Sequence, residues 1–204
     1  MAGADPPLER LLAWGIELEG HPDNVAASLA GGLTLCVPEE GGPPALLRPE
    51  LHPELAVAAA WPETPVDTAR ARAALPRAVP HADAVENARR LPLLLEGLAT
   101  ADPVLLDRGS RDRLHVPYRL ALIPGGAAAL SAARGAGAWM ATISGSGSAL
   151  VALGPRDRAQ AVAEAMASAL RAEGQEATGR VLLPVTRAPR VLPVRGPAEG
   201  PAER

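Results

Sequence analysis

The sequence predicts an α+β fold, with an antiparallel sheet that carries helices on one face. Segments in which apolar residues recur at helical spacing alternate with short β-rich runs, and about four of these runs follow residue 50. Two of them, residues 138–144 and 148–154, are separated only by Gly and Ser residues, which indicates a hairpin or a strand–loop–strand unit. Strands interleaved with helices in this manner are typical of the α+β class.

The segment before residue 40 predicts two helices and a strand. Residues 8–19 have apolar side chains at helical spacing and predict a first helix, which Pro22 ends or bends. Residues 24–32 predict a short second helix that closes at a Gly-Gly pair. Residues 33–37 are an apolar run that predicts a strand, and a connection rich in Gly and Pro follows.

The segment after residue 50 begins with a predicted strand at residues 55–62, because Pro62 closes this apolar run early. A helix is expected over residues 67–76, with a cap at its first or second residue and a stop at its final proline. Residues 81–100 predict a longer helix. Pro92 lies inside it and predicts either a kink or a division into two helices.

The rest of the chain predicts three further helices and a last strand. We expect them at residues 102–107, 125–137, 156–174 and 179–185. The character of the sequence changes from about Leu46. Residues 186–204 show no pattern and predict a disordered tail.

Composition excludes several classes of protein. The 204 residues are 48% hydrophobic, which is enough to bury a core, and the net charge of -3 gives no indication of nucleic acid or an anionic membrane surface. The chain has no lysine, so the phosphate loop of a P-loop NTPase is excluded. A single cysteine, Cys36, cannot form an internal disulfide, and no signal peptide or membrane-spanning apolar stretch is evident. We therefore expect a cytoplasmic protein.

The strongest local cluster of polar residues is His21, Asp23 and Asn24, within the segment "EGHPDN". Asp and Asn cap helices, and a helix is predicted to follow, so capping alone accounts for one of them. A substrate site would account for all three. Zinc is a poor alternative because no second His and no Cys stand at ligand spacing, and a Ser–His–Asp hydrolase lacks its G-x-S-x-G elbow here.

Three more segments are candidates for binding an anion. The Gly/Ser segment at residues 143–148 lets backbone N–H groups approach an anion, although it is equally consistent with a hairpin turn. Arg119 lies between two prolines, and its planar fork suits a carboxylate or phosphate; an arginine that extends to solvent is the alternative. Arg70 and Arg72 do not share a helix face, so at most one would point into a site, and both are also consistent with a solvated face.

Taken together, these segments resemble one family. "ELEGHPDNVAASLAGGL", "TARARAALP", "HVPYRLALIPG" and "ISGSGSALVAL" occur in this order and at similar spacing in bacterial homoserine kinases, which belong to the GHMP small-molecule kinase superfamily. The resemblance covers roughly residues 8–185. Its first and third segments are specific to the homoserine branch, whereas "SGSG" is shared across the superfamily. It implies a ferredoxin-like C-terminal domain at residues 48–185 and a remnant of the N-terminal domain at residues 1–47.

The resemblance implies an enzyme, a phosphotransferase that uses ATP and Mg²⁺ to phosphorylate the hydroxyl of L-homoserine to O-phospho-L-homoserine, a step towards threonine. It implies a homoserine pocket in which three polar residues form the wall and two arginines hold the carboxylate: His21, Asp23, Asn24, Arg72 and Arg119. The loop beside the phosphates would be Ser144, Gly145, Ser146 and Gly147, followed by Ser148 where the family usually has proline. Glu17 would bind Mg²⁺, with Glu19 as its rival, and no catalytic base is assigned.

The resemblance also leaves out a part of the family pattern. GHMP kinases carry an upstream phosphate loop of the form P-x-x-x-G-L-G-S-S-A, and these 204 residues contain none. We expect the chain to correspond to the C-terminal two-thirds of a homoserine kinase and to lack activity by itself. Two alternatives stay open: a non-catalytic amino-acid-binding or scaffold module, and another GHMP kinase. Homoserine and ATP are the expected partners, without nucleic acid or membrane, and the resemblance is also compatible with a homodimer.

Overall fold

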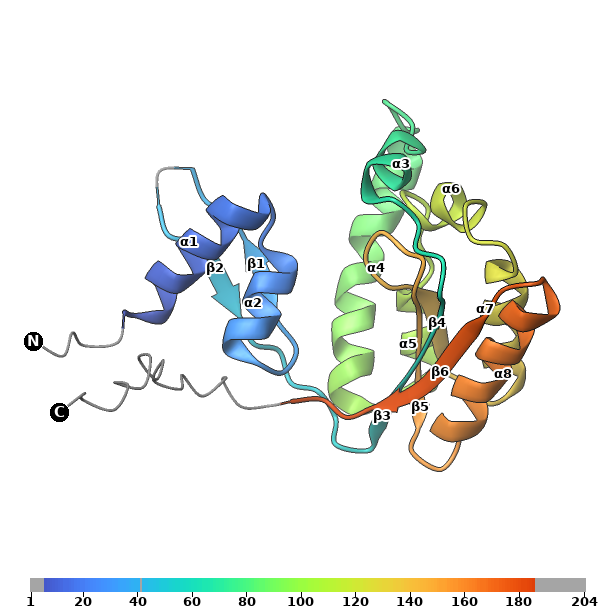
Figure 1. The fold of residues 1–204 in the computed structure, drawn as a ribbon. Helices are drawn as coiled ribbons and strands as arrows, with labels where there is room; N and C mark the ends of the chain where they lie inside the picture. The colour runs from blue at the N-terminus through green and yellow to red at the C-terminus, as the bar shows by residue number, and fades with distance from the viewer. Residues whose placement is uncertain (1–5, 41, 186–204) are drawn as a thin grey trace, which may run out of the picture. The chain divides into compact units, whose positions relative to one another are not determined.

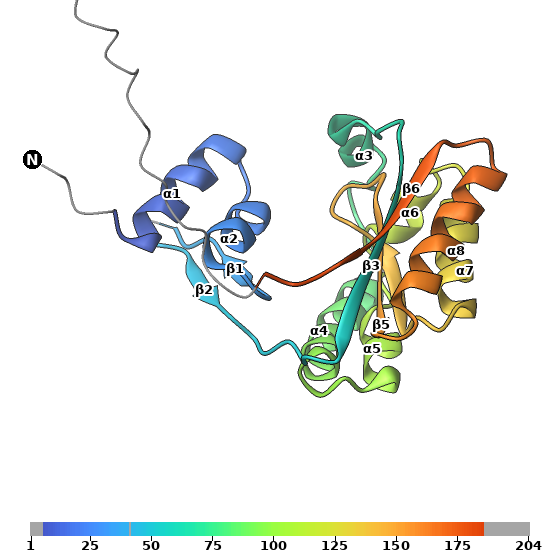
Figure 2. The ribbon, with the colours of Figure 1, turned by 60° about the horizontal axis from the view of Figure 1, so that its bottom comes forward.

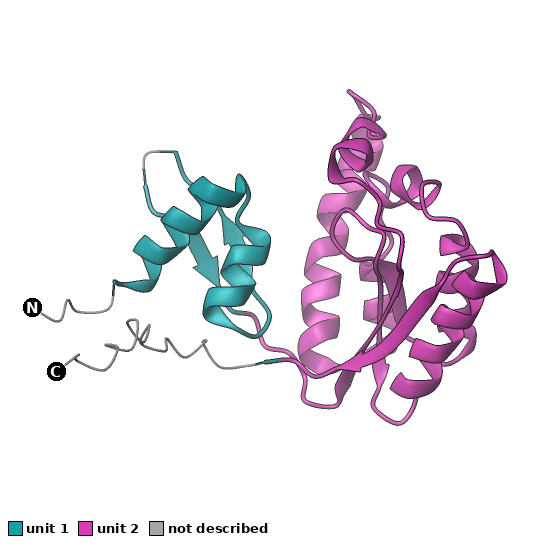
Figure 3. Ribbon diagram, viewed as in Figure 1, with its two compact units in different colours: residues 1–48, 185–204 teal, residues 49–184 magenta. Residues whose placement is uncertain are grey.

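The computed structural model describes residues 6–40 and 42–185. The chain divides into two compact units, which we call the first unit (Met1–Arg48 with Val185–Arg204) and the second unit (Pro49–Pro184) (Figure 3). The tail predicted at residues 186–204 lies outside the described residues. None of the described helices is long and apolar enough to cross a membrane.

The first unit consists of two helices and a two-stranded sheet: α1 (Leu8–Glu19), α2 (Asp23–Ala30), β1 (Leu35–Val37) and β2 (Ala45–Leu47) (Figure 1). The two helices and the strand β1 confirm the prediction, although β1 is shorter than expected. The helix α1 ends at Gly20, whose φ of 75° is left-handed and whose N–H donates to the Ile16 carbonyl at 2.8 Å. β2 was not predicted; it pairs antiparallel with β1, with Cys36 opposite Leu46.

The second unit contains six helices and four strands among its described residues: β3 (Leu55–Pro62), α3 (Thr68–Ala73), α4 (His81–Thr100), α5 (Pro103–Gly109), α6 (Val116–Leu120), α7 (Gly126–Gly135), β4 (Met140–Ile143), β5 (Leu150–Pro155), α8 (Ala159–Ala172) and β6 (Ala177–Leu182). The strand predicted at residues 55–62 is confirmed with both its ends. The short helix α6 was not predicted.

The four strands form one antiparallel sheet in the order β4-β5-β3-β6, which confirms the predicted α+β fold. β3 is central, so Ala58 stands opposite both Ala152 of β5 and Val181 of β6. The helices α7 and α8 cover one face of the sheet (Figures 1 and 2). The core between them is built mainly from small side chains, and Ala60, Ala152, Ala163 and Ala167 are fully buried there.

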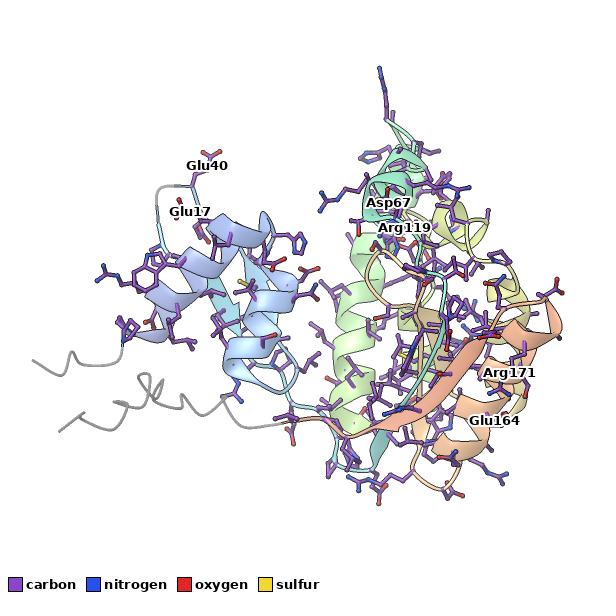
Figure 4. The ribbon with its side chains drawn as sticks, in the orientation of Figure 1. Glu17, Glu40, Asp67, Arg119, Glu164 and Arg171 are labelled. Atoms are coloured by element: carbon purple, nitrogen blue, oxygen red, sulfur yellow. The ribbon has the colours of Figure 1, made fainter. Side chains whose placement is uncertain are left out.

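Close packing follows from this small-residue core. A Cβ added to Gly179 of β6 would lie 2.3 Å from the Ala163 carbonyl oxygen of α8, so only glycine allows this strand and helix to approach so closely. The outer face of α8 is polar, and Arg171 there pairs with Glu164 at 2.8 Å (Figure 4). The helix α8 is therefore amphipathic, as its sequence pattern predicted.

The helices α4 and α5 lie on the other side of the sheet, so helices are not confined to one face (Figures 1 and 2). Met140 and Thr142, which alternate along β4 with the core residues, line a pocket together with α4 residues. The helix α4 runs unbroken through Pro92, so the predicted alternative of two helices is wrong. α5 packs tightly on it, because a Cβ at Gly109 would lie 2.4 Å from the Leu94 nitrogen.

Candidate active site

The Gly/Ser loop joins β4 to β5 as a tight hairpin turn. The Ser144 N–H donates to the Ala149 carbonyl at 2.8 Å, and the Gly147 N–H donates to the Ser144 carbonyl at 2.9 Å. Gly145 and Gly147 have φ values of 57° and 89°, a conformation that favours glycine. Two of the loop's N–H groups thus serve the turn itself, and its glycines allow a ligand to approach the backbone closely.

Arg119 reaches this loop from α6. Its Nη1 donates to the Gly145 carbonyl oxygen at 3.2 Å (Figure 4 labels Arg119). Its Nε is buried and has no hydrogen-bond partner within the described part of the chain. The side chain is therefore half-buried against the loop, which does not fit the alternative of an arginine that simply extends to solvent. Two sequence motifs that lie far apart in the chain meet at this contact.

Arg72 and Arg70 lie on α3, which Asp67 caps by accepting the Ala69 N–H at 2.7 Å. Both arginines are exposed. Arg70, not Arg72, lines a pocket of about 430 Å³ that Ser148, the residue after the loop, also lines. Arg72 is thus outside this pocket, and its role at a substrate carboxylate stays a prediction.

In the first unit, His21 and Asp23 form a contact at the start of α2. The His21 Nδ1 lies 2.7 Å from the Asp23 Oδ1, which also accepts the backbone N–H of Asn24 at 2.9 Å. Partial burial alone would raise the pKa of Asp23, but the Asn24 amide and the His21 ring outweigh it and hold the pKa below its usual value. Asp23 is therefore a carboxylate at neutral pH. Pro22 occupies the cap position of α2 and provides no side-chain bond.

The two candidate magnesium ligands lie on α1 and differ in their surroundings. Residues two apart on a helix are separated by about 200°, so Glu17 and Glu19 point in nearly opposite directions. Glu19 lines a groove of about 490 Å³ between α1 and α2 together with Asn24. Glu17 is exposed on α1 (Figure 4), outside that groove. No cluster of three or more His, Cys, Asp or Glu side chains that could hold a metal occurs among the described residues.

The chemistry of a single glutamate still fits Mg²⁺. This ion is usually bound by one or two carboxylates together with waters and phosphate oxygens, rather than by an all-protein cage. Either glutamate would thus suffice as the protein's share of the coordination when a nucleotide supplies the rest.

Sequence reasoning missed the residues that support α6. Asp112 accepts hydrogen bonds from three backbone N–H groups at the start of this segment and from the side-chain amide of Asn87. Burial would raise the pKa of Asp112, but these donors prevail and lower it. An isolated aspartate in the polar segment at residues 107–113 carries no periodic signal, so the capping pattern was the only available indication.

Known proteins resemble this chain in sequence and in fold. Residues 94–172 match the family model described as "GHMP kinases C terminal". Residues 94–172 thus correspond to the C-terminal domain of the GHMP kinases. The chain is also 44% identical over 174 residues to a homoserine kinase of Synechococcus sp. (strain RCC307), a match that covers 85% of this chain and 55% of that protein. A homoserine kinase of Gloeobacter violaceus is 48% identical over 153 residues, which cover 74% of this chain and 50% of that protein.

Solved structures agree with this GHMP kinase assignment. The crystal structure of homoserine kinase from Cytophaga hutchinsonii matches 93% of this chain and 62% of its own, with a TM-score of 0.85 and 30% identity. The structure of mevalonate kinase from L. major matches 90% of this chain and 60% of its own with a TM-score of 0.59, and its 16% identity supports a likeness of fold alone. The chain spans about half the length of the curated relatives that it matches.

The predicted site residues belong to both units. His21, Asp23 and Asn24 with the two glutamates lie in the first unit, and the two arginines with the loop lie in the second. The structure brings Arg119 to the loop and His21 to Asp23. That all of them form one pocket is a proposal.

Proposed function

We propose that this GHMP kinase chain takes part in the ATP-dependent phosphorylation of the hydroxyl of L-homoserine, in the cytoplasm, giving O-phospho-L-homoserine. The observation that carries the proposal is the contact of Arg119 with the Gly/Ser loop, because it fixes a cation beside the segment that the whole superfamily shares. The relatives named homoserine kinase support the choice of acceptor.

Homoserine is a zwitterion with one reactive hydroxyl, so its site needs groups of both charges. The planar fork of Arg119 offers paired donors to the carboxylate, and Arg72 is the proposed second cation. Asp23, whose pKa is held low, supplies a negative charge for the ammonium, and Asn24 next to it supplies an amide. His21 holds the Asp23 carboxylate in place through the 2.7 Å contact.

Catalysis in phosphoryl transfer consists mostly of positioning and charge neutralisation, and these residues fit such a role. They would orient the amino acid and hold it still, which leaves its hydroxyl as the free end. Mg²⁺, when bound with ATP, neutralises charge on the phosphates; Glu17 is its proposed ligand, with Glu19 as the rival. No residue is proposed as a catalytic base.

The test is homoserine-dependent release of ADP in a coupled assay. Because the chain matches only about half of the length of its relatives, two samples are needed. One is the 204-residue chain, and the other is a chimera that joins to it the part of the Synechococcus relative that it does not match. We expect turnover by the chimera with L-homoserine, and much less with L-serine, which is one methylene shorter, or with mevalonate, which lacks the ammonium.

Three results would contradict the proposal. One is an active chimera that prefers mevalonate, which would assign the chain to another branch of the GHMP kinases. Another is a folded chimera that binds homoserine in a titration without any turnover, which would favour the alternative of a non-catalytic amino-acid-binding module. A chimera that lacks both binding and turnover would exclude homoserine as the ligand.

A further inference from the structure

We propose that Asp112 and Asn87 are positioning residues for Arg119. They fix the first turn of α6, and this turn in turn places the Arg119 guanidinium against the Gly/Ser loop. The inference rests on the proposed function in one respect only, which is that Arg119 holds the homoserine carboxylate.

The helix α6 requires support from outside because it has only five residues. The N–H groups in the first turn of any helix have no partner within the helix. His115 occupies the cap position but makes no side-chain cap bond, and Pro117 has no N–H to donate. The Asp112 Oδ2 instead accepts from the backbone N–H groups of Leu114, His115 and Val116, at 3.1, 2.8 and 2.7 Å. One carboxylate oxygen thus holds the first N–H group of α6 and the two backbone N–H groups that precede the helix.

The long helix α4 holds Asp112 in turn. The Asn87 side-chain amide donates to the Asp112 Oδ1 at 2.8 Å, and the Asn87 Oδ1 accepts the Arg113 backbone N–H at 2.8 Å. The Arg113 side chain pairs with Asp83, one turn earlier on α4, at 2.8 Å. The Asp112 side chain is only 13% exposed. The capped segment is therefore attached to a 20-residue helix and does not depend on local chain stiffness.

A continuous series of hydrogen bonds leads from this cap to Arg119. His115 donates its N–H to Asp112, and its carbonyl accepts the Arg119 backbone N–H at 3.0 Å. The Arg119 carbonyl accepts the Leu122 N–H at 2.9 Å, and its Nη1 bonds to the Gly145 carbonyl. If the first turn opened, the backbone of Arg119 would lose its fixed direction, and its fork would no longer face one position.

The first experiment measures amide hydrogen exchange in α6 of the 204-residue chain. Loss of a helix cap allows the turn to open more often, and Asp112→Ala should speed exchange at residues 114–119 by about 5- to 30-fold. Asp112→Asn keeps an acceptor oxygen, so its effect should be smaller. Asp102→Ala is the matched control, because Asp102 caps α5 through the N–H groups of Val104 and Leu105 in the same manner. It should leave exchange in α6 unchanged.

The second experiment observes Arg119 directly, through the NMR signal of its buried Nε–H, which Arg119→Lys would identify by removing it. Asp112→Ala should shift this signal and speed its exchange with water, whereas Asp102→Ala should not. An unchanged signal and unchanged α6 exchange in Asp112→Ala would overturn the inference. These readouts need no substrate, so they decide it even if the proposed function fails.

A homoserine titration connects the two proposals. Asp112→Ala should weaken homoserine binding, and the double variant with Arg119→Ala should bind no more weakly than Arg119→Ala alone, because one residue acts through the other. Additive losses would show that Asp112 acts on the ligand by another route and would refute its positioning role. Failure of the unmodified chain and of the chimera to bind homoserine would refute the proposed function instead.

Discussion

Replacing Arg119 by alanine is expected to raise the KM for homoserine far more than the KM for ATP. The structure gives the guanidinium one contact of its own, the 3.2 Å bond from Nη1 to Gly145, and leaves its buried Nε without a partner among the described residues. The fork therefore has donors to spare for a ligand. Hydrogen bonds to charged groups contribute about 1.5–3 kcal/mol, which corresponds to roughly a 10- to 150-fold rise in KM.

The assay is coupled ADP release by the chimera, with each substrate varied while the other is saturating. Arg158→Ala is the matched control: it removes an exposed arginine of the same unit, whose side chain pairs with its neighbour Asp157 on the surface. That variant should leave the KM for homoserine nearly unchanged. Arg119→Lys should recover only part of the affinity, because an ammonium cannot present two parallel donors.

The reasoning would be refuted by equal changes in both KM values, since these would indicate general loss of the loop rather than loss of a substrate contact. It would also be refuted by a lower kcat with an unchanged KM for homoserine. In that case Arg119 would act on the transferring phosphoryl group, which an arginine can equally stabilise.

Three further predictions concern the metal, the packing and the pH dependence. Glu17→Gln should raise the Mg²⁺ concentration needed for half-maximal turnover of the chimera, whereas Glu19→Gln, on the opposite side of α1, should not. The reverse result would make Glu19 the Mg²⁺ ligand. Gly179→Ala should lower the free energy of unfolding by about 1–3 kcal/mol because its Cβ would strike the backbone of α8, whereas Gly135→Ala, with open space around it, should be neutral or slightly stabilising in a denaturant titration. Burial would raise the pKa of Asp112, but its hydrogen-bond donors prevail and lower it, so its contribution to stability is present above its unfolded pKa of about 3.8 and is lost as the pH falls through the lower folded value. Urea titrations at several pH values between about 6 and 2 should therefore show that the free energies of unfolding of the protein and of Asp112→Asn become more similar as the pH falls. A difference that stays constant would contradict this.

The sequence allowed the main elements of the fold to be predicted because their signals are local. Residues 55–62 combine an apolar run with a closing proline, and the strand has those bounds. The helix α8 has a clear apolar stripe, which the structure buries against the sheet. The strand β2 was missed because its three residues lie among prolines and glycines, and its strand character comes from pairing with β1. Pro92 suggested a division of the helix in two, but α4 continues through it because the helix tolerates the loss of one hydrogen bond.

The candidate site was only partly predictable, because a side chain's direction depends on distant partners. Arg119 was recognisable as a cation in an apolar setting, but the sequence alone favoured a side chain that extends to solvent over a fixed one. The side chain is fixed by its hydrogen bond to the Gly145 carbonyl oxygen, 26 residues later in the chain. Arg70 and Arg72 are likewise equivalent in sequence, yet only Arg70 lines the pocket near Ser148. Spacing identifies which residues are candidates, and tertiary contacts select among them.

The helix α6 shows why such selection matters for function. A five-residue segment with proline in its first turn does not form a stable helix by propensity. It is supported by Asp112, which accepts the first N–H group of the helix and the two that precede it, and by Asn87, which attaches Asp112 to α4. The direction of the Arg119 guanidinium then depends on the Asp112 carboxylate, which is not proposed to contact the substrate. Substrate affinity should therefore respond to Asp112, and the response should fall on homoserine rather than on ATP, because Arg119, which α6 places against the loop, is the residue proposed to hold the amino acid.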